Sequence, residues 1–231
     1  MENYYTTHEG RFMNEIKMAL PYYQRVVADA YGAEFAREIA AETIEGFRAL
    51  LPEMPYIGGN ENPLTTNLTL TAPLMVLYQS LSKRGKTALE AARLIYLGTA
   101  SMYSNFPFNA ILWMRGRREF SNRNLDMTRQ RAIRSQERRY PQNWVAEFVP
   151  GDGKTFIYGI NYTECGILKY LAAHGVSEIS PYLCSLDIPM CRAMHVGFSR
   201  TETLAKGDAR CNFRFFRWGE QPEMKPDFLV S

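Results

Sequence analysis

The sequence predicts an α+β fold, in which N-terminal helices pack with a C-terminal antiparallel sheet that carries two short helices. Three observations support this prediction. Apolar residues recur at helical spacing through most of the first half, the spacing changes to strand-like alternation after Pro141, and glycine turns separate the later segments. We therefore expect a single domain over residues 1–231, mainly helical over 1–140 and with the sheet over 141–231.

Helical periodicity is clearest before residue 105. We expect helices over RFMNEIKMALPYYQRVVADAYG, AEFAREIAAETIEGFRALL, APLMVLYQSLSKRG and TALEAARLIYLGTASMY. Pro21 predicts a break or kink in the first helix, and Gly32 ends it. Thr87 and Glu90 have the spacing of a capping box at the start of the fourth. The segment PYIGGNENPLTTN is too polar and too interrupted for a regular element, so we expect a loop there.

The second half predicts strands joined by glycine turns. NWVAEFVPGDGKTFIYGINY is typical of a hairpin that turns at residues 151–153, and AMHVGFSRTETL with ARCNFRFFRW predicts a closing pair of strands around Gly207 and Asp208. Short helices are expected in NYTECGILKYLAAHG and after Ser180 and Pro181 in SPYLCSLDIP.

Composition and charge limit the class of protein. The chain has 231 residues, 46% hydrophobic and 22% charged, and a net charge of +3, which is ordinary for a globular protein and too small to indicate nucleic-acid binding. No apolar run is long enough for a membrane span, and the first residues do not resemble a signal peptide, so we expect a cytoplasmic protein.

Nine arginines against three acids lie between Arg115 and Arg139. A phosphate-binding surface is one interpretation, but no nucleic-acid motif accompanies the arginines. We favour the solvated face of a helix, and a homodimer interface remains the further alternative.

Four cysteines, at 165, 184, 191 and 211, fall in the last third of the chain without a C-x-x-C pair. A free cysteine is commonly a small buried hydrophobe, but four close together favour a shared role. Cys165 is expected in the first turn of a helix, where the dipole favours a thiolate. Cys184 has Asp187 three residues further on, so the two could form a nucleophile with a carboxylate partner, unless Asp187 only caps a turn.

His195 is the best placed of the three histidines, in an expected strand that leads to Arg200. An ordinary packed or surface role is the alternative. No serine-hydrolase triad, paired metal-binding histidines or phosphate loop is present in the sequence.

Five segments together resemble the L-2-amino-thiazoline-4-carboxylic acid hydrolase family. They are YIGGNENPLTTNL, APLMVLYQSLSKRGKTALEAA, FVPGDGKTFIYGINYTECGILKYL, EISPYLCSLD and RTETLAKGDARCNFRF. The end of the last segment is also similar to four-vinyl-reductase-type ligand-binding domains, which share a fold with TRAPP transport subunits. That resemblance implies a mixed domain with a pocket, often dimeric. Zinc-binding relatives have a cysteine at the position of Thr203, so we expect no metal cofactor, with zinc on Cys165, Cys184 and Cys211 as the alternative.

The family resemblance implies an enzyme that opens a cyclic amidine, such as L-2-amino-thiazoline-4-carboxylate, toward a carbamoyl-cysteine. Our hypothesis is that Cys184 or Cys165 attacks the amidine carbon, Asp187 holds the amidinium and Arg200 binds the substrate carboxylate. We expect Cys211 to point into the same pocket. The remaining candidates for substrate binding are Thr203, His195, Asn60 and Asn62. The alternative function is a non-catalytic sensor of small molecules, which needs the pocket but no reactive thiol.

Overall fold

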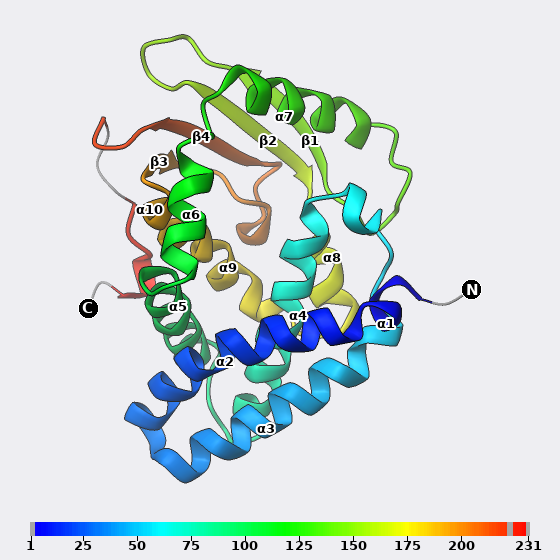
Figure 1. Cartoon of the computed structure of the whole chain (residues 1–231), viewed down its shortest axis with the longest axis vertical. Coiled ribbons are helices and arrows are strands. Elements are labelled where there is room, and N and C mark those ends of the chain that lie inside the picture. The colour runs from blue at the N-terminus through cyan, green and yellow to red at the C-terminus, as the bar shows by residue number, and fades with distance from the viewer. Residues whose placement is uncertain (1–2, 221–223, 230–231) are drawn as a thin grey trace. The chain divides into compact units, whose positions relative to one another are not determined.

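The computed structural model describes residues 3–220 and 224–229, and it confirms the α+β class (Figure 1). The chain divides into two compact units. The first consists of residues up to Ser101 together with Ile167–Leu183, and the second of Met102–Gly166 together with the residues from Cys184 onward. Each unit therefore combines two separate stretches of the sequence, whereas the expected change at residue 140 follows the order of the elements along the chain.

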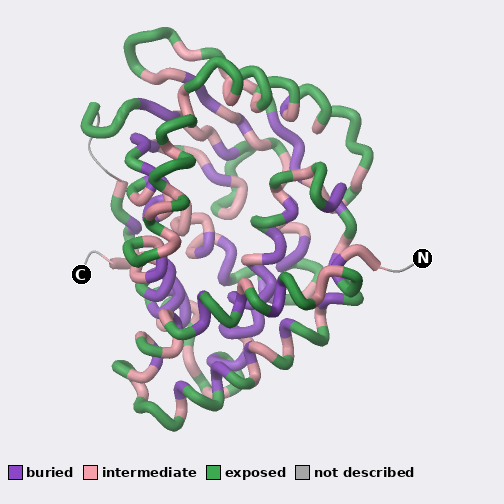
Figure 2. Tube along the Cα trace, in the orientation of Figure 1, coloured by how far each residue is buried: buried purple, intermediate pink, exposed green. Residues whose placement is uncertain are grey.

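The first unit is helical. It contains α1 (Tyr4–Thr7), α2 (Glu9–Tyr31), α3 (Ala33–Leu50), α4 (Leu64–Ser82), most of α5 (Ala88–Ser104), most of α8 (Gly166–Ala173) and α9 (Ser180–Leu183). Helix α3 packs against α2 and α4. Helix α4 is apolar on nearly all sides and is buried along most of its length (Figure 2), as expected for a helix at the centre of a core. None of the described helices is both long and apolar enough to cross a bilayer.

Local signals in the helical half predict most boundaries. The capping box is confirmed, because the Thr87 amide donates to Glu90 Oε2 at 2.8 Å and the Glu90 amide donates to Thr87 Oγ1 at 3.2 Å. Helix α2 continues through Pro21, so the predicted break is wrong, while the alternative of a kink there stays a prediction. Leu20 and Tyr23 on either side of Pro21 are buried, so core packing holds one continuous helix. The predicted loop after Pro55 also ends early, at Leu64, where α4 begins.

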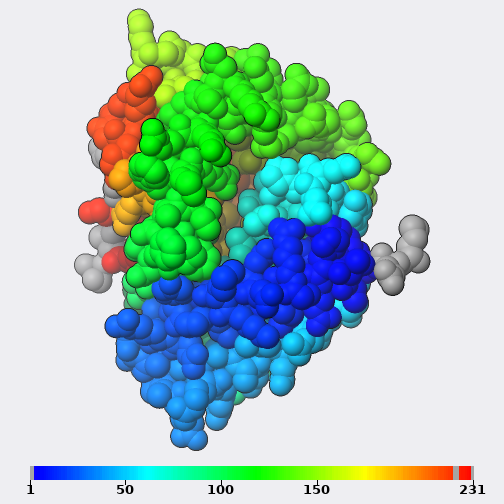
Figure 3. Space-filling view, in the orientation of Figure 1, coloured from blue at the N-terminus to red at the C-terminus, as the bar shows by residue number. Residues whose placement is uncertain are grey.

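The second unit contains the sheet. Its strands are β1 (Val145–Pro150), β2 (Tyr158–Glu164), β3 (Val196–Ser199) and β4 (Cys211–Arg217), in the order β1-β2-β4-β3 with antiparallel neighbours. Its helices are α6 (Phe108–Gly116), α7 (Asn122–Ser135) and α10 (Asp187–Met194). Helix α7 packs on β1, and α10 packs on both α6 and β3. The side chains of α6 and α7, green in Figure 3, form much of the outer surface of this unit on the face in view.

One face of the sheet can be followed through the strand register. Tyr158 pairs with Phe215 and Tyr162 pairs with Cys211, so these four side chains share a face because successive residues of a strand alternate. The buried core of the unit lies on this face and consists of Tyr158, Cys191, Met194, Val196, Phe198 and Phe215. Next to this core, α6 and α10 approach each other closely at Gly116. A Cβ at this position would lie only 1.8 Å from the Met194 carbonyl oxygen, so a glycine is needed there.

The strand pairs form as predicted, but their connections are longer. Strand β2 begins at Tyr158, so residues 151–157 form a loop in which the Asp152 carboxylate accepts the amides of Lys154 and Thr155 at 2.9 and 2.7 Å. Strand β3 ends at Ser199, and residues 200–210 form a loop instead of a tight hairpin. This loop contains a 3-10 turn at Leu204–Lys206, and Gly207 follows it with φ of 94°.

Candidate functional site

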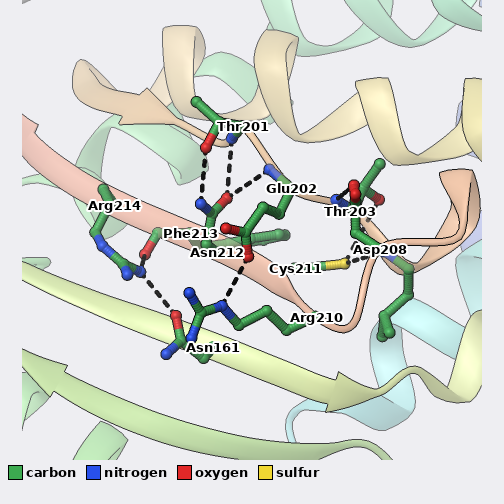
Figure 4. Close-up of polar contacts among 11 residues, drawn as sticks. Asn161, Thr201, Glu202, Thr203, Asp208, Arg210, Cys211, Asn212, Phe213 and Arg214 are labelled. Carbon is green, nitrogen blue, oxygen red and sulfur yellow. Dashed lines mark hydrogen bonds and ion pairs between the residues drawn. The ribbon is translucent and has the colours of Figure 1, made fainter.

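The loop between β3 and β4 is held by side chains of the closing segment (Figure 4). The Asn212 side-chain oxygen accepts the backbone amides of Thr201 and Glu202 at 2.9 and 2.8 Å, and the Asp208 carboxylate accepts the amide of Thr203 at 2.7 Å. The Arg210 guanidinium donates to Glu202 at 2.7 Å. These bonds order a stretch that has no strand or α-helix of its own.

The ordered loop brings Thr203 against two thiols. The Thr203 hydroxyl lies 3.8 Å from Cys184 Sγ and 3.5 Å from Cys211 Sγ. The Leu204 amide also donates to Cys211 Sγ, at 3.3 Å. Thr203 and Cys211 are buried, and Cys184 is half-buried. Two of the predicted thiols, 27 residues apart in the chain, therefore meet at one hydroxyl group.

Arg200 and Asp187 form an ion pair beside these thiols. Arg200 Nη1 donates to Asp187 Oδ2 at 2.9 Å, and Nη2 donates to the Cys184 carbonyl oxygen at 2.9 Å. The Arg200 side chain is only 8% exposed and lies over the ring of Phe213, 5.1 Å from its centre. The Asp187 side chain keeps 29% of its surface exposed, so its carboxylate is the more accessible member of the pair.

Helix boundaries explain the position of Asp187. Cys184 lies in a 3-10 turn, Cys184–Leu186, and Asp187 is the first residue of α10. The two residues therefore do not share one continuous α-helix. An aspartate in the first turn of a helix is favoured by the exposed amides and the helix dipole, so Asp187 both begins α10 and pairs with Arg200.

Burial sets the protonation of the site. Burial raises the pKa of the Cys184 thiol to about 11, while the positive charge of Arg200 opposes the rise and the negative charge of Asp187 adds to it. Burial also raises the pKa of Asp187, and Arg200 lowers it through its charge and hydrogen bond. Cys184 is consequently a neutral thiol at neutral pH, not the free thiolate that a helix start alone would favour.

Two tyrosines near this group were not among the residues predicted from the sequence. Burial raises the pKa of Tyr103 to about 12, with the charge of Asp187 adding to the rise and that of Arg115 opposing it. Burial likewise raises the pKa of Tyr162, and the charges of Asp187, Cys165 and Cys211 add to it. Both phenols are neutral donors within electrostatic reach of Asp187. Within the described ranges, neither hydroxyl has a hydrogen-bond partner from the protein. In the sequence, one signal could have indicated Tyr162: the two-residue spacing of Tyr158, Ile160 and Tyr162, which places the three side chains on the same face of a strand.

The other two cysteines lie at different depths. Cys165 is half-buried and immediately precedes α8, three residues after Tyr162. Cys191 is buried in the core of the unit, and burial raises its pKa well above the ordinary value. Among the described residues, no three His, Cys, Asp or Glu side chains are arranged to hold a metal ion. The three-thiol zinc set is therefore not assembled in this structure.

His195 lies at the end of α10 and not in a strand, which corrects the prediction. It adopts a left-handed conformation with φ of 53°, and its exposed ring stacks on Trp218 at 5.5 Å between centres. This backbone conformation stops the helix before β3 begins.

Asn60 and Asn62 belong to the first unit, where Asn60 bonds to the N-terminal helices and Asn62 to its own loop. Asn60 accepts a hydrogen bond from the Tyr4 hydroxyl at 2.7 Å, and Asn62 donates to the Ile57 carbonyl oxygen at 2.6 Å. Both side chains therefore have partners within the first unit, and their part in substrate binding stays a prediction.

A cavity of about 170 Å³ opens along α10 and β3. Its lining is mostly apolar and includes Ile188, Cys191, Phe198, Phe216 and Trp218. Cys191 and Phe198 of this lining also belong to the core of the unit, whereas Cys184, Cys211 and Thr203 are not among the lining residues.

The fold and these contacts define an α+β protein with buried and half-buried thiols, neutral phenols and a partly buried arginine–carboxylate pair in its sheet unit. The chain belongs to the L-2-amino-thiazoline-4-carboxylic acid hydrolase family, whose model matches residues 70–215. The matched range begins in α4 and ends in β4, so it includes every residue of the group around Thr203. Neither a curated protein nor a solved structure matches the chain significantly.

Proposed function

We propose that the protein hydrolyses a cyclic amidine such as L-2-amino-thiazoline-4-carboxylate to a carbamoyl-cysteine. Membership of the hydrolase family supports the reaction class. The observation that supports the site is the contact of Asp187 with Arg200, beside the Cys184 backbone and thiol. A carboxylate next to a thiol is the combination that a cationic amidine needs, with one group to hold the charge and the other to attack the carbon.

The attacking group in this proposal is the Cys184 sulfur. Because Cys184 is a neutral thiol, its proton must leave before or during attack. A neutral amidine nitrogen accepts this proton, so the substrate becomes an amidinium held by Asp187 as the new S–C bond forms. The ring bond of this tetrahedral adduct breaks first, and the leaving ring atom takes a proton from an amidine nitrogen, which leaves a trigonal carbon bound to Cys184. Water then adds to that carbon, the bond to Cys184 breaks, and a proton of the added water restores the thiol. Overall, one water is added to one substrate.

The competing mechanism uses no covalent intermediate. Asp187 accepts a proton from water, and this water attacks the amidine carbon directly. Variants separate the two mechanisms. Turnover should be lost in Cys184→Ser under the covalent mechanism, with Cys165→Ser as its companion because Cys165 is the second candidate nucleophile. Full turnover in both variants would refute covalent catalysis and favour the water mechanism.

Incubation of the purified chain with the thiazoline carboxylate tests the function itself. Mass spectrometry should detect a product heavier by one water. A thiol reagent then identifies the bond that breaks, since cleavage of the ring C–S bond releases a free thiol and cleavage of the ring C–N bond does not. Absence of any product with the wild-type chain, at protein concentrations comparable to the substrate, would contradict the proposal.

One observation favours the sensor as a second candidate function. A thiol with a pKa of about 11 reacts slowly at neutral pH, as the cysteines of a purely binding site would. The sensor predicts that the thiazoline carboxylate binds and persists unchanged. The hydrolase predicts that it disappears.

A further inference from the structure

We infer that Arg115 and Arg131, and not Arg200, bind the carboxylate of a small dipolar ligand beside Tyr162. This inference rests on the proposed function and deepens it, because it orients the substrate. The Arg200 guanidinium already donates to Asp187 and to the Cys184 carbonyl, is 8% exposed and is stacked on Phe213. A bidentate contact with a ligand would require breaking these bonds.

Helix α7 places Arg131 over the sheet face that holds Tyr162. The guanidinium of Arg129 lies 5.0 Å from the ring centre of Phe148, and the Ser135 hydroxyl accepts the Ala146 amide at 2.9 Å. Ala146 is paired with Tyr162. Arg131 lies one helical turn before Ser135, so it projects from the same side of α7.

Helix α6 places Arg115 near the same residues. Its neighbour Gly116 contacts the Met194 backbone of α10 so closely that no side chain would fit between them. The position of Arg115 is thereby fixed against α10, and its charge reaches Tyr162 and Tyr103. Burial and the charge of Asp187 raise the pKa of both phenols, and Arg115 opposes the rise.

The two arginines have no ion-pair partner in the part of the chain that the structure describes. Over residues 3–220 and 224–229, neither Arg115 nor Arg131 forms an ion pair with a carboxylate. Burial lowers the pKa of Arg131, the charges of Arg134 and Arg115 lower it further, and Glu119 opposes them. Glu119 itself accepts a hydrogen bond from the Tyr158 hydroxyl. The charges of the half-buried Arg131 and the exposed Arg115 repel one another, and a bound anion relieves this repulsion.

The resulting arrangement has two poles of opposite charge, both within electrostatic reach of Tyr162. Asp187 provides a negative pole and the two arginines a positive one. A ligand with a cationic amidine at one end and a carboxylate at the other matches both poles. Tyr162, which is neutral and has no protein partner among the described residues, can donate to either ligand oxygen or sulfur between them. This predicts a preference for amino-acid-like amidines over those without a carboxylate.

The test compares two ligands in matched variants. Calorimetry measures the binding of L-2-amino-thiazoline-4-carboxylate and of 2-aminothiazoline, which lacks the carboxylate, to Cys184→Ser protein so that turnover does not interfere. Adding Arg131→Gln or Arg115→Gln should lower the affinity for the thiazoline carboxylate roughly 10- to 100-fold and leave the affinity for 2-aminothiazoline unchanged. Arg123→Gln, an exposed position in the first turn of α7, is the matched control. Arg131→Lys replaces Arg131→Gln should the latter fail to fold.

A second measurement separates this inference from the proposed function. Millimolar sulfate at constant ionic strength should raise the unfolding temperature of the wild-type and Arg123→Gln chains more than that of Arg131→Gln. If the wild-type chain neither binds nor hydrolyses the thiazoline, the function is wrong and the sulfate result alone decides the anion site. The inference would be overturned if sulfate raised the unfolding temperature equally in all variants, or if the arginine variants lost affinity equally for both ligands.

Discussion

Arg200 and Asp187, thirteen residues apart in the chain, form a partly buried ion pair at 2.9 Å, and the same guanidinium donates to the Cys184 carbonyl oxygen. This contact connects the end of β3 to the start of α10. It holds the two segments that bring Cys184 toward Thr203. The pair is therefore structural as well as chemical, and its removal should affect both folding and activity.

Replacing Arg200 by methionine should destabilise the chain by about 2–3 kcal/mol. Asp187 would lose its partner, and the loss should lie below the range for a fully buried pair because its side chain is 29% exposed. The midpoint of urea unfolding measures the effect. The double variant Arg200→Met with Asp187→Asn should recover much of the loss, since no unpaired charge is then left. If the double variant lost as much stability as the two single variants added together, the two side chains would not be energetically coupled.

The Cys184 thiol should resist alkylation at neutral pH. Its pKa is raised to about 11, so the reactive thiolate becomes abundant only above the pH at which an unfolded cysteine ionises. Iodoacetamide labelling, followed peptide by peptide, should give a rate at Cys184 that climbs up to about pH 11. The chain in denaturant provides the reference, with an ordinary titration.

The same pKa shift predicts how stability depends on pH. A thiol with a raised pKa in the folded chain binds its proton more tightly there, so its contribution is complete below the unfolded pKa and is lost as the pH rises toward 11. Stability should therefore fall less steeply over this range in Cys184→Ala than in the wild type. An identical slope in both chains would argue against the shift.

Replacing Thr203 by cysteine should create a metal site. The Thr203 hydroxyl lies 3.8 and 3.5 Å from the sulfurs of Cys184 and Cys211, and sulfurs that share a tetrahedral zinc at about 2.3 Å are separated by similar distances. The Thr203→Cys variant should bind cobalt(II) with the intense absorption of thiolate ligands. Thr203→Ser keeps the hydroxyl and should show no such band, and neither should the wild type. A colourless Thr203→Cys protein that is correctly folded would contradict the geometry.

Replacing Tyr162 by phenylalanine should slow turnover by roughly tenfold or more without reducing stability. The hydroxyl is neutral and has no protein partner in the described part of the chain, so its loss breaks no internal bond, whereas a donor to the reacting ligand would be missing. Steady-state kinetics and thermal unfolding measure the two effects. Tyr140→Phe, at a position outside the strands, is the control. Unchanged kinetics in Tyr162→Phe would remove it from the site.

Local sequence signals predicted the elements that depend on neighbouring residues. The capping box of Thr87 and Glu90 forms as expected, because its groups lie within one helical turn. The exchange of helical for strand-like spacing after Pro141 also predicted the α+β class. In contrast, Pro21 did not break α2, because the buried residues beside it hold the helix together.

The site was predictable only in part. The closing segment identified the family, and it contains Arg200, Thr203 and Cys211, which the structure brings together with Cys184 and Asp187. The roles of Tyr103, Tyr162, Arg115 and Arg131 were not predictable, because each lies in an ordinary helix or strand pattern and gains its meaning from residues far away in the chain. His195 was misplaced for a related reason, since a left-handed helix end has no reliable signal in a histidine.

By itself, the sequence determined the family, the α+β class and helix starts such as that of α5, because these follow from motifs and from periodicities within a few residues. The tertiary structure alone decided which thiols meet, that Arg200 is occupied by Asp187, and that Cys184 is protonated. The physical reason is that burial and charge act through space. Cys184 lies in a 3-10 turn before α10, and desolvation by the surrounding residues raises the pKa of its thiol, which the residues next to it in the chain do not reveal.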